Sequence, residues 1–193
     1  MIMNSKHLCK LFFILIISGL YQCKSKEKFE SEFVKIDFDK ASVQIMDTLS
    51  SQLIGKWNLQ QIEFDLKYIN YEGSVKKDTI FQDFAILEIK SVSREILRHP
   101  SFNGQIIYKD QYWPVKFRLI ADPGRITEKT GPHAFTLIEW DFPTGSRPWK
   151  QEEMFIKNFG LEGENFSIQL NDSRSMVWKG LKRDIKEIQM KKI

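Results

Sequence analysis

Short segments of alternating apolar and polar residues follow one another from Gly55 to the end of the 193-residue chain, and this repetition constrains the fold more than any other feature. Within the segments Phe, Trp, Ile and Val recur at alternate positions, and Gly, Asn, Asp or Pro separates one segment from the next. This pattern predicts about eight to ten β-strands joined by short turns. Strands this close in sequence pair antiparallel, and closing the sheet into a barrel hides its edges most completely.

The expected strands can be placed by residue number. They are 57–66, 79–90, 104–109, 112–121, 134–142, 150–159, 164–170, 174–181 and 185–193. In the first of them the apolar residues change parity between Leu59 and Ile62, which predicts a β-bulge near Gln60 and Gln61. Pro114 has no backbone N–H, so we expect an edge position or a bulge near the start of its strand.

The connections are less regular than the strands. Asp110-Gln111 is expected to be a tight link, whereas 91–103 fits either a helical insertion or a strand with a ragged end. Residues 37–55 place apolar side chains at helical intervals, with Asp37 or Asp39 as the N-cap. The predicted fold class is therefore mostly β, an antiparallel barrel preceded by a short N-terminal helix, whole or broken.

The N-terminus has the three zones of a secretory signal. Lys6 and Lys10 precede the apolar stretch "LFFILIISGL" (11–20), which Tyr21 and Gln22 follow. As a helix this stretch covers about 15 Å, whereas a bilayer core needs roughly 20 residues to span. A cleaved signal is therefore expected rather than a permanent membrane helix.

Leu20-Tyr21-Gln22-Cys23 resembles the lipobox of bacterial lipoproteins, whose cysteine is diacylated and becomes the new N-terminus. The resemblance implies a lipid anchor at Cys23 and a place in the cell envelope, on the outer membrane or facing the periplasm. Gln22 departs from the small residue usual before that cysteine. An ordinary cleaved signal and a soluble secreted or periplasmic protein is therefore the alternative.

Three regions follow from these assignments. They are a lipoprotein signal peptide at 1–22, a flexible tether at 23–36 and a barrel domain at 37–193. The tether is mostly charged and has too little apolar surface to offset the entropy that it would lose on becoming ordered. Cys9 lies in the signal, so no cysteine remains beyond Cys23 to form a disulfide and the fold must rest on packing. Loss of Lys6 and Lys10 reduces the formal charge from +4 to +2, which argues against a nucleic-acid partner.

Gly55-Lys56-Trp57 joins the predicted helix to the first strand and resembles the Gly-x-Trp signature of lipocalins and of bacterial lipocalin-like lipoproteins. Gly allows a sharp turn, and Trp two residues later points into the barrel bottom. In that family an arginine near the last strand packs across the tryptophan. Arg183 is the candidate and Arg174 a weaker one. The Thr-Asp-Tyr motif of the family has no counterpart, and a different antiparallel sandwich or barrel with a core tryptophan is the alternative.

The resemblance implies non-catalytic binding of a small hydrophobic or amphipathic molecule at the envelope. A filled barrel that acts as an interaction or structural module is the alternative. No enzyme is expected, because Gly-x-Ser-x-Gly, Walker and Gly-x-Gly-x-x-Gly motifs are missing from the sequence. No cofactor or metal is expected either, since His99 and His133 each adjoin a proline and lie outside any metal-ligand spacing.

The tryptophans divide into two groups. Trp113, Trp140 and Trp178 lie in predicted strands and are expected in the core. Trp149 follows Arg147 in the loop "GSRPWK", where both are candidates for contact with an anionic amphiphile, a glycan or a protein. The alternative is that the Trp149 ring folds back over one end of the barrel.

Overall fold

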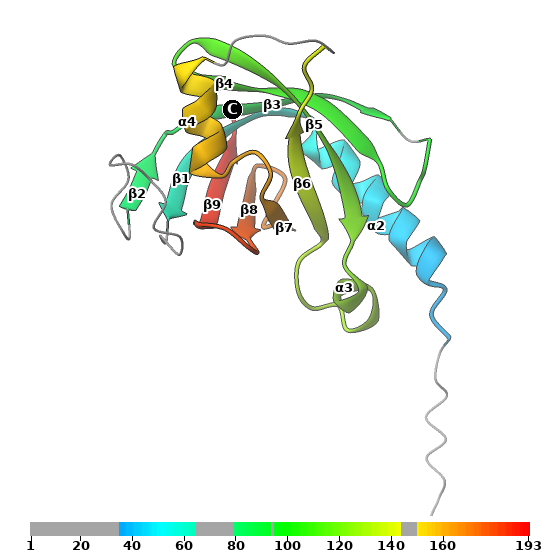
Figure 1. Ribbon diagram of the computed structural model, residues 1–193. Coiled ribbons are helices and arrows are strands. Elements are labelled where there is room, and N and C mark those ends of the chain that lie inside the picture. The colour runs from blue at the N-terminus through cyan, green and yellow to red at the C-terminus, as the bar shows by residue number, and fades with distance from the viewer. Residues whose placement is uncertain (1–34, 65–78, 94, 144–149) are drawn as a thin grey trace, which may run out of the picture. The chain divides into compact units, whose positions relative to one another are not determined.

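The computed structural model describes residues 35–64, 79–93, 95–143 and 150–193, and Ile36–Ile193 forms one compact unit. Its strands are β1 (Gly55–Phe64), β2 (Thr79–Gln82), β3 (Ile86–Ser93), β4 (Ser101–Tyr108), β5 (Gln111–Ala121), β6 (Ala134–Trp140), β7 (Asn165–Leu170), β8 (Ser175–Gly180) and β9 (Ile185–Lys192). They form one antiparallel sheet in the order β2-β1-β3-β4-β5-β6-β7-β8-β9, and an additional β1–β9 pairing closes it (Figure 1). The predicted fold class, a mostly β, lipocalin-like antiparallel barrel, is confirmed.

The closed ring consists of eight strands, β1 and β3 to β9, with β2 as an extension. β3 pairs with the first half of β1 and β2 with the second half. The prediction of one continuous strand at 79–90 is therefore wrong. The segment is divided into β2 and β3 near Asp83, which adopts a positive φ of 47°. The break stays against β1, because Phe84 N–H donates to the Leu59 carbonyl and Leu59 N–H donates to the Ala85 carbonyl.

The bulge predicted in the first strand is confirmed. The register of β1 against β9 shifts between Leu59 and Gln61. Leu59, Ile62 and Phe64 are all buried despite their different parity in the sequence. Because of the extra residue, the apolar side chains in the second half of β1 also point into the barrel.

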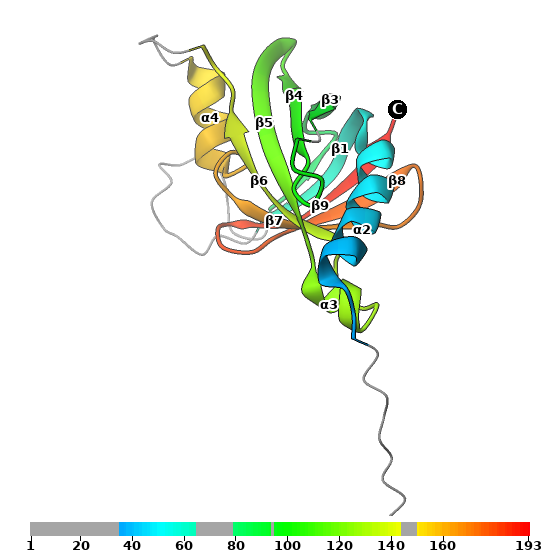
Figure 2. The same ribbon diagram turned by 90° about the vertical axis from the view of Figure 1, so that its right-hand side faces the viewer.

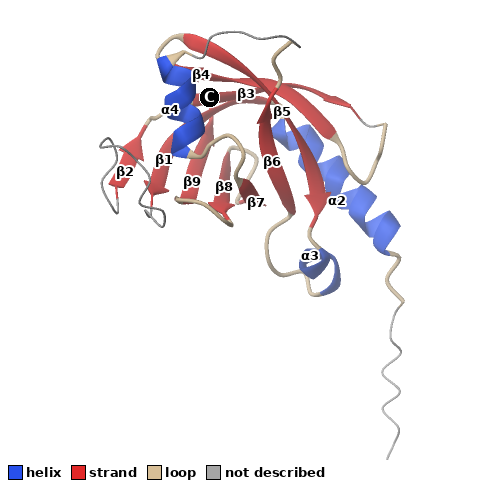
Figure 3. Cartoon of the chain, viewed as in Figure 1, coloured by secondary structure: helices blue, strands red, loops and turns tan. Residues whose placement is uncertain are grey.

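Three helices accompany the sheet in the described ranges: α2 (Phe38–Leu53), α3 (Pro123–Thr127) and α4 (Gln151–Phe159) (Figure 3). Asp37 caps α2 by accepting a hydrogen bond from Lys40 N–H at 3.0 Å, as predicted. α2 is unbroken and buries Met46, Leu49 and Leu53 on one face. It packs near β5 and α3 (Figure 2).

The strand predicted at 150–159 is wrong, because most of this segment forms α4. Glu153, Ile156 and Phe159 are buried at three-residue intervals, which is the spacing of a helical face. Glu152 and Glu153 therefore lie in the first helical turn and not on opposite faces of a strand. Gly160 ends the helix with a left-handed φ of 90°.

Two predicted connections are now resolved. The turn between β4 and β5 is Lys109-Asp110, both at positive φ, and Gln111 already pairs with Tyr108. The predicted link Asp110-Gln111 is thus displaced by one residue. In 91–103, β3 runs to Ser93 and β4 begins at Ser101, so the ragged strand end is the correct alternative.

The prediction of an edge position or a bulge at Pro114 is wrong, because β5 lies inside the sheet and pairs with β4 and β6 without a register shift. The Pro114 carbonyl accepts from Asp141 N–H, one residue beyond the end of β6. The nitrogen and carbonyl of one strand residue point to the same side. The Pro114 nitrogen, which carries no hydrogen, therefore faces the position just beyond the end of β6. No backbone hydrogen bond to β4 is lost.

Candidate functional site

The two ends of the barrel are built differently. The closed end holds Trp57, α3, the β3–β4 connection and the C-terminal half of α2. The mouth, at the opposite end, holds Phe64 at the end of β1, the β4–β5 turn, Trp140 at the end of β6, and α4 (Figures 1 and 2). α4 belongs to the connection between β6 and β7, so this connection brings a helix to the mouth.

A column of aromatic rings occupies the interior below the mouth. Phe102 and Phe117 stack with ring centroids 5.0 Å apart, and Phe117 meets Trp178 edge-on at 6.0 Å. Phe166 continues the column at 5.6 Å from Trp178. All four side chains are buried. Side chains thus occupy this part of the barrel, and any ligand must be accommodated above them.

Aromatic side chains also line the mouth, but several of these are only partly buried. Phe159 of α4 stacks on Phe64 at 5.0 Å and on Phe84 at 4.6 Å. Phe155 stacks on Tyr108 at 5.8 Å. Phe84, Tyr108 and Phe155 pack against the core while keeping partial exposure. α4 therefore covers the mouth through ring contacts, and these leave an aromatic wall at its edge.

Two indole N–H groups near the mouth have no hydrogen-bond partner among the described residues. Trp113 and Trp140 lie with ring centroids 6.4 Å apart, and the Nε1 atom of each is buried and unpaired. Trp113 is only 3% exposed. A buried donor without a partner costs about 1–3 kcal/mol and is uncommon in native proteins. The pair therefore marks a place suited to an acceptor atom from another molecule.

A cation lies over the Trp113 ring. The Lys150 Nζ atom is 5.5 Å from the Trp113 ring centroid and donates to Gln111 Oε1 at 3.3 Å. An ammonium and two indole donors together favour an oxygen acceptor, above all an anionic one. The mouth thus combines an apolar aromatic wall with a group of donors, which suits an amphipathic molecule.

The sequence predicted part of this arrangement. Trp113 and Trp178 are core residues as expected, and Trp140 is partly buried against the core. The alternation of apolar residues near a strand end indicated that Trp113 and Trp140 point into the barrel. Nothing in the sequence indicated that their N–H groups would lack a hydrogen-bond partner among the described residues. Trp149, Arg147 and the anchor candidate Cys23 lie outside the described residues.

The Gly55–Trp57 motif closes the opposite end. Gly55 has a φ of 129°, which L side chains rarely adopt. Trp57 is fully buried, and its Nε1 donates to the Leu53 carbonyl at 2.7 Å. The cation over the ring is Lys192, with Nζ 5.1 Å from the ring centroid and 2.8 Å from the Gln52 carbonyl oxygen. Lys192 thus ties the last strand to both the tryptophan and α2.

The prediction that Arg183 packs across Trp57 is wrong. Arg183 lies between β8 and β9 at the mouth, where its guanidinium packs against Gly163 and donates to the Glu162 carbonyl at 3.3 Å. The weaker candidate, Arg174, lies in the β7–β8 turn at the closed end, but its side chain is exposed. The β1–β9 register pairs Trp57 with Lys192, and this pairing decides which cation reaches the ring.

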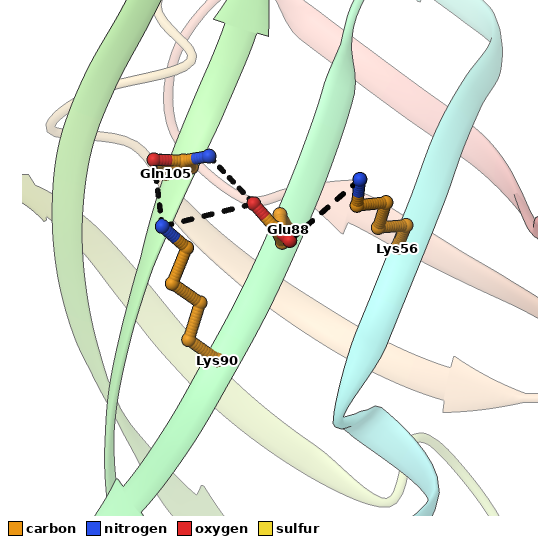
Figure 4. A network of polar contacts seen from close by, with 4 residues as sticks. All are labelled: Lys56, Glu88, Lys90 and Gln105. Atoms are coloured by element: carbon orange, nitrogen blue, oxygen red, sulfur yellow. Dashed lines mark hydrogen bonds and ion pairs between the residues drawn. The ribbon is translucent and has the colours of Figure 1, made fainter.

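A polar cluster on the outer wall joins three strands (Figure 4). Glu88 of β3 accepts from Gln105 Nε2 at 2.5 Å, and its carboxylate lies 3.8 Å from both Lys56 and Lys90. Nearby, a Cβ on Gly104 would lie 2.2 Å from the Glu88 carbonyl, so glycine allows β4 to approach β3 here. Exposed ion pairs contribute roughly 0–1 kcal/mol each. We therefore interpret the cluster as a link between strands.

His99 lies in the β3–β4 connection, and His133 directly precedes β6. Within the described ranges, no group of three or more His, Cys, Asp or Glu side chains is placed to hold a metal ion. His133 Nδ1 accepts from Leu170 N–H at 3.4 Å. Burial, and secondly the charge of Arg125, lower the pKa of His133 below its usual value.

Stability should decrease when the pH falls through the titration range of His133. Because its pKa is lower in the folded chain, the unfolded chain binds the proton first. The free energy of unfolding should therefore fall from about pH 6.5 downward and level off once folded His133 is protonated. Urea denaturation across this range should show a smaller decrease for His133→Asn. His99→Asn is the control, because it leaves His133 in place, and an unchanged decrease in His133→Asn would contradict the assignment.

Comparison with protein-family models, curated proteins and solved structures gives no match to this chain. The class of protein is therefore defined by its own fold and site. It is an antiparallel, lipocalin-like β-barrel of eight strands, closed at one end by a buried tryptophan and covered at the other by a helix.

Proposed function

We propose that the protein binds a compact amphipathic molecule at the barrel mouth, without catalysis, while anchored to a membrane of the cell envelope through acyl chains on Cys23. The observation that carries the binding proposal is the pair of buried indole donors on Trp113 and Trp140, which have no partner among the residues that the structure describes. The lipobox-like sequence supports the anchor. No helix in the described part of the chain is long and apolar enough to cross a bilayer.

The structure restricts the size of the proposed ligand. The column of Phe102, Phe117, Phe166 and Trp178 occupies the interior, so a long chain extending down the barrel axis would meet side chains. A short apolar part lying against Phe84, Tyr108 and Phe155 avoids this clash. Its oxygen-bearing group would then accept from Trp113 and Trp140, with Lys150 balancing a negative charge.

Binding can be tested with decanoate as the probe and decylamine as a matched amphiphile without an acceptor. We expect Trp113→Phe to weaken decanoate binding about tenfold, because one hydrogen bond to a charged group contributes roughly 1.5 kcal/mol. Its free energy of unfolding should stay equal or rise, since the unpaired donor is removed. Isothermal titration calorimetry and urea denaturation measure the two quantities.

Trp178→Phe is the matched control for this test. The Trp178 Nε1 atom has a partner, Met176 Sδ at 3.2 Å, and lies in the column below the mouth. This variant should lose stability and keep its affinity. Equal affinity of the wild type and Trp113→Phe for decanoate, or tight binding of decylamine, would contradict the proposed site.

The same aromatic column favours a second candidate, a filled barrel that acts as an interaction or structural module. Native mass spectrometry of protein taken from its own membrane separates the two. A retained small molecule supports ligand binding, whereas acyl mass alone, together with failure of the wild type to bind decanoate, supports the module. The same spectrum tests the anchor, which an unmodified N-terminus beyond Cys23 would exclude.

A further inference from the structure

Large apolar side chains are exposed together at the closed end of the barrel. Ile96 and Leu97, in the β3–β4 connection, are 50% and 54% exposed. Covering adjacent exposed apolar residues of a surface turn with an apolar phase is favourable, because it removes their surface from water.

One contact joins this turn to the start of α2, and a second stabilises the turn itself. Arg98 Nη1 lies 2.5 Å from Asp39 Oδ1, and His99 N–H donates to the Ile96 carbonyl at 2.9 Å. Residues of the turn and of the first turns of α2, among them Leu97 and Val43, line a common shallow hollow. Ile96 and Leu97 therefore share one defined surface with the start of α2, and we call these two residues the apolar tip.

The chain enters the barrel domain at this surface. The compact unit begins at Ile36, and α2 starts two residues later. The segment 24–35 separates this point from Cys23 and can reach at most roughly 40 Å when extended. A membrane that holds Cys23 is thus within reach of the apolar tip, whereas the mouth lies at the far end of the barrel.

We propose that the apolar tip inserts shallowly into the surface of the bilayer that carries the anchor, so that the closed end faces the membrane and the mouth faces away. This inference rests on the proposed lipid anchor. The charges around the tip balance, because Lys40 and Arg98 lie next to Asp39 and Glu95. Insertion is therefore driven by apolar burial, and anionic lipids or low salt should not strengthen it.

The test uses the acylated full chain in phosphatidylcholine vesicles, with an environment-sensitive fluorophore on Ile96→Cys. The matched control is Leu181→Cys, which is 53% exposed but lies after β8 at the mouth. Acylation of Cys23 leaves no other thiol in the mature chain to be labelled. Brominated lipids should quench the label at 96 several-fold more than the label at 181, and the second substitution Leu97→Asp should reduce the quenching at 96.

Each outcome is decisive for one of the two proposals. A chain that floats with the vesicles while the label at 96 stays unquenched would overturn insertion and leave the anchor intact. A chain that does not float contradicts the anchor itself. Quenching that requires anionic lipid or disappears at high salt would show electrostatic adsorption, which also overturns insertion of the apolar tip.

Discussion

Replacing Glu164 with alanine is expected to lower the free energy of unfolding by about 3–5 kcal/mol. The Glu164 side chain is buried, and its carboxylate accepts backbone N–H groups from Asn165 at 2.8 Å, from Lys182 at 3.0 Å and from Arg183. Alanine would leave these donors without that acceptor. The measurement is urea denaturation of the full chain, followed by circular dichroism.

Two further variants make this prediction specific. Glu164→Gln keeps one carbonyl oxygen and should lose less stability than Glu164→Ala. Glu162→Ala is the neighbouring control, because Glu162 contributes its backbone carbonyl to Arg183 and this survives the substitution. Equal losses for Glu162→Ala and Glu164→Ala would show that the carboxylate does not hold the β8–β9 turn.

Truncating Trp57 to alanine is the second change with a large expected effect, a loss of about 3–5 kcal/mol. The substitution removes a fully buried ring and the hydrogen bond from Nε1 to the Leu53 carbonyl. It also removes the surface on which Lys192 rests. Trp57→Phe keeps most of the side-chain volume and should lose less stability. This variant provides the measurement if the alanine variant does not fold.

A double-mutant cycle identifies the cation that acts on Trp57. Trp57→Phe combined with Lys192→Met should show a coupling energy of about 0.5–1 kcal/mol, as expected for a partly buried cation over an indole. Trp57→Phe combined with Arg183→Met should be additive, because Arg183 lies at the mouth. Coupling to Arg183 and additivity with Lys192 would reverse our assignment.

Features set by local pattern were predictable from the sequence. The parity change between Leu59 and Ile62 correctly located the bulge, because one apolar face must stay buried along the whole strand. Asp37 was a recognisable N-cap for the same local reason. α4 was missed because a nine-residue helix whose buried face includes Glu153 carries too weak a periodic signal.

Features set by register and burial were not predictable. Lys192 rather than Arg183 reaches Trp57 because β1 and β9 pair in one particular register, which residue types do not reveal. The unpaired donors of Trp113 and Trp140 depend on what surrounds each ring in space. Glu164 was the first residue of the predicted strand 164–170 and gave no sign in the sequence that three backbone donors would surround it.

The pairing of β1 with β9 also determines when the domain can finish folding. Every other pair in the ring joins strands that follow one another among β3 to β9, or joins β1 to nearby β3, so each of these pairs needs only a short loop to close. β1 keeps one edge open until β9 arrives, and that closure carries the largest loop-entropy cost in the sheet. A chain in which β9 has not yet paired with β1 would therefore expose two strand edges that promote aggregation.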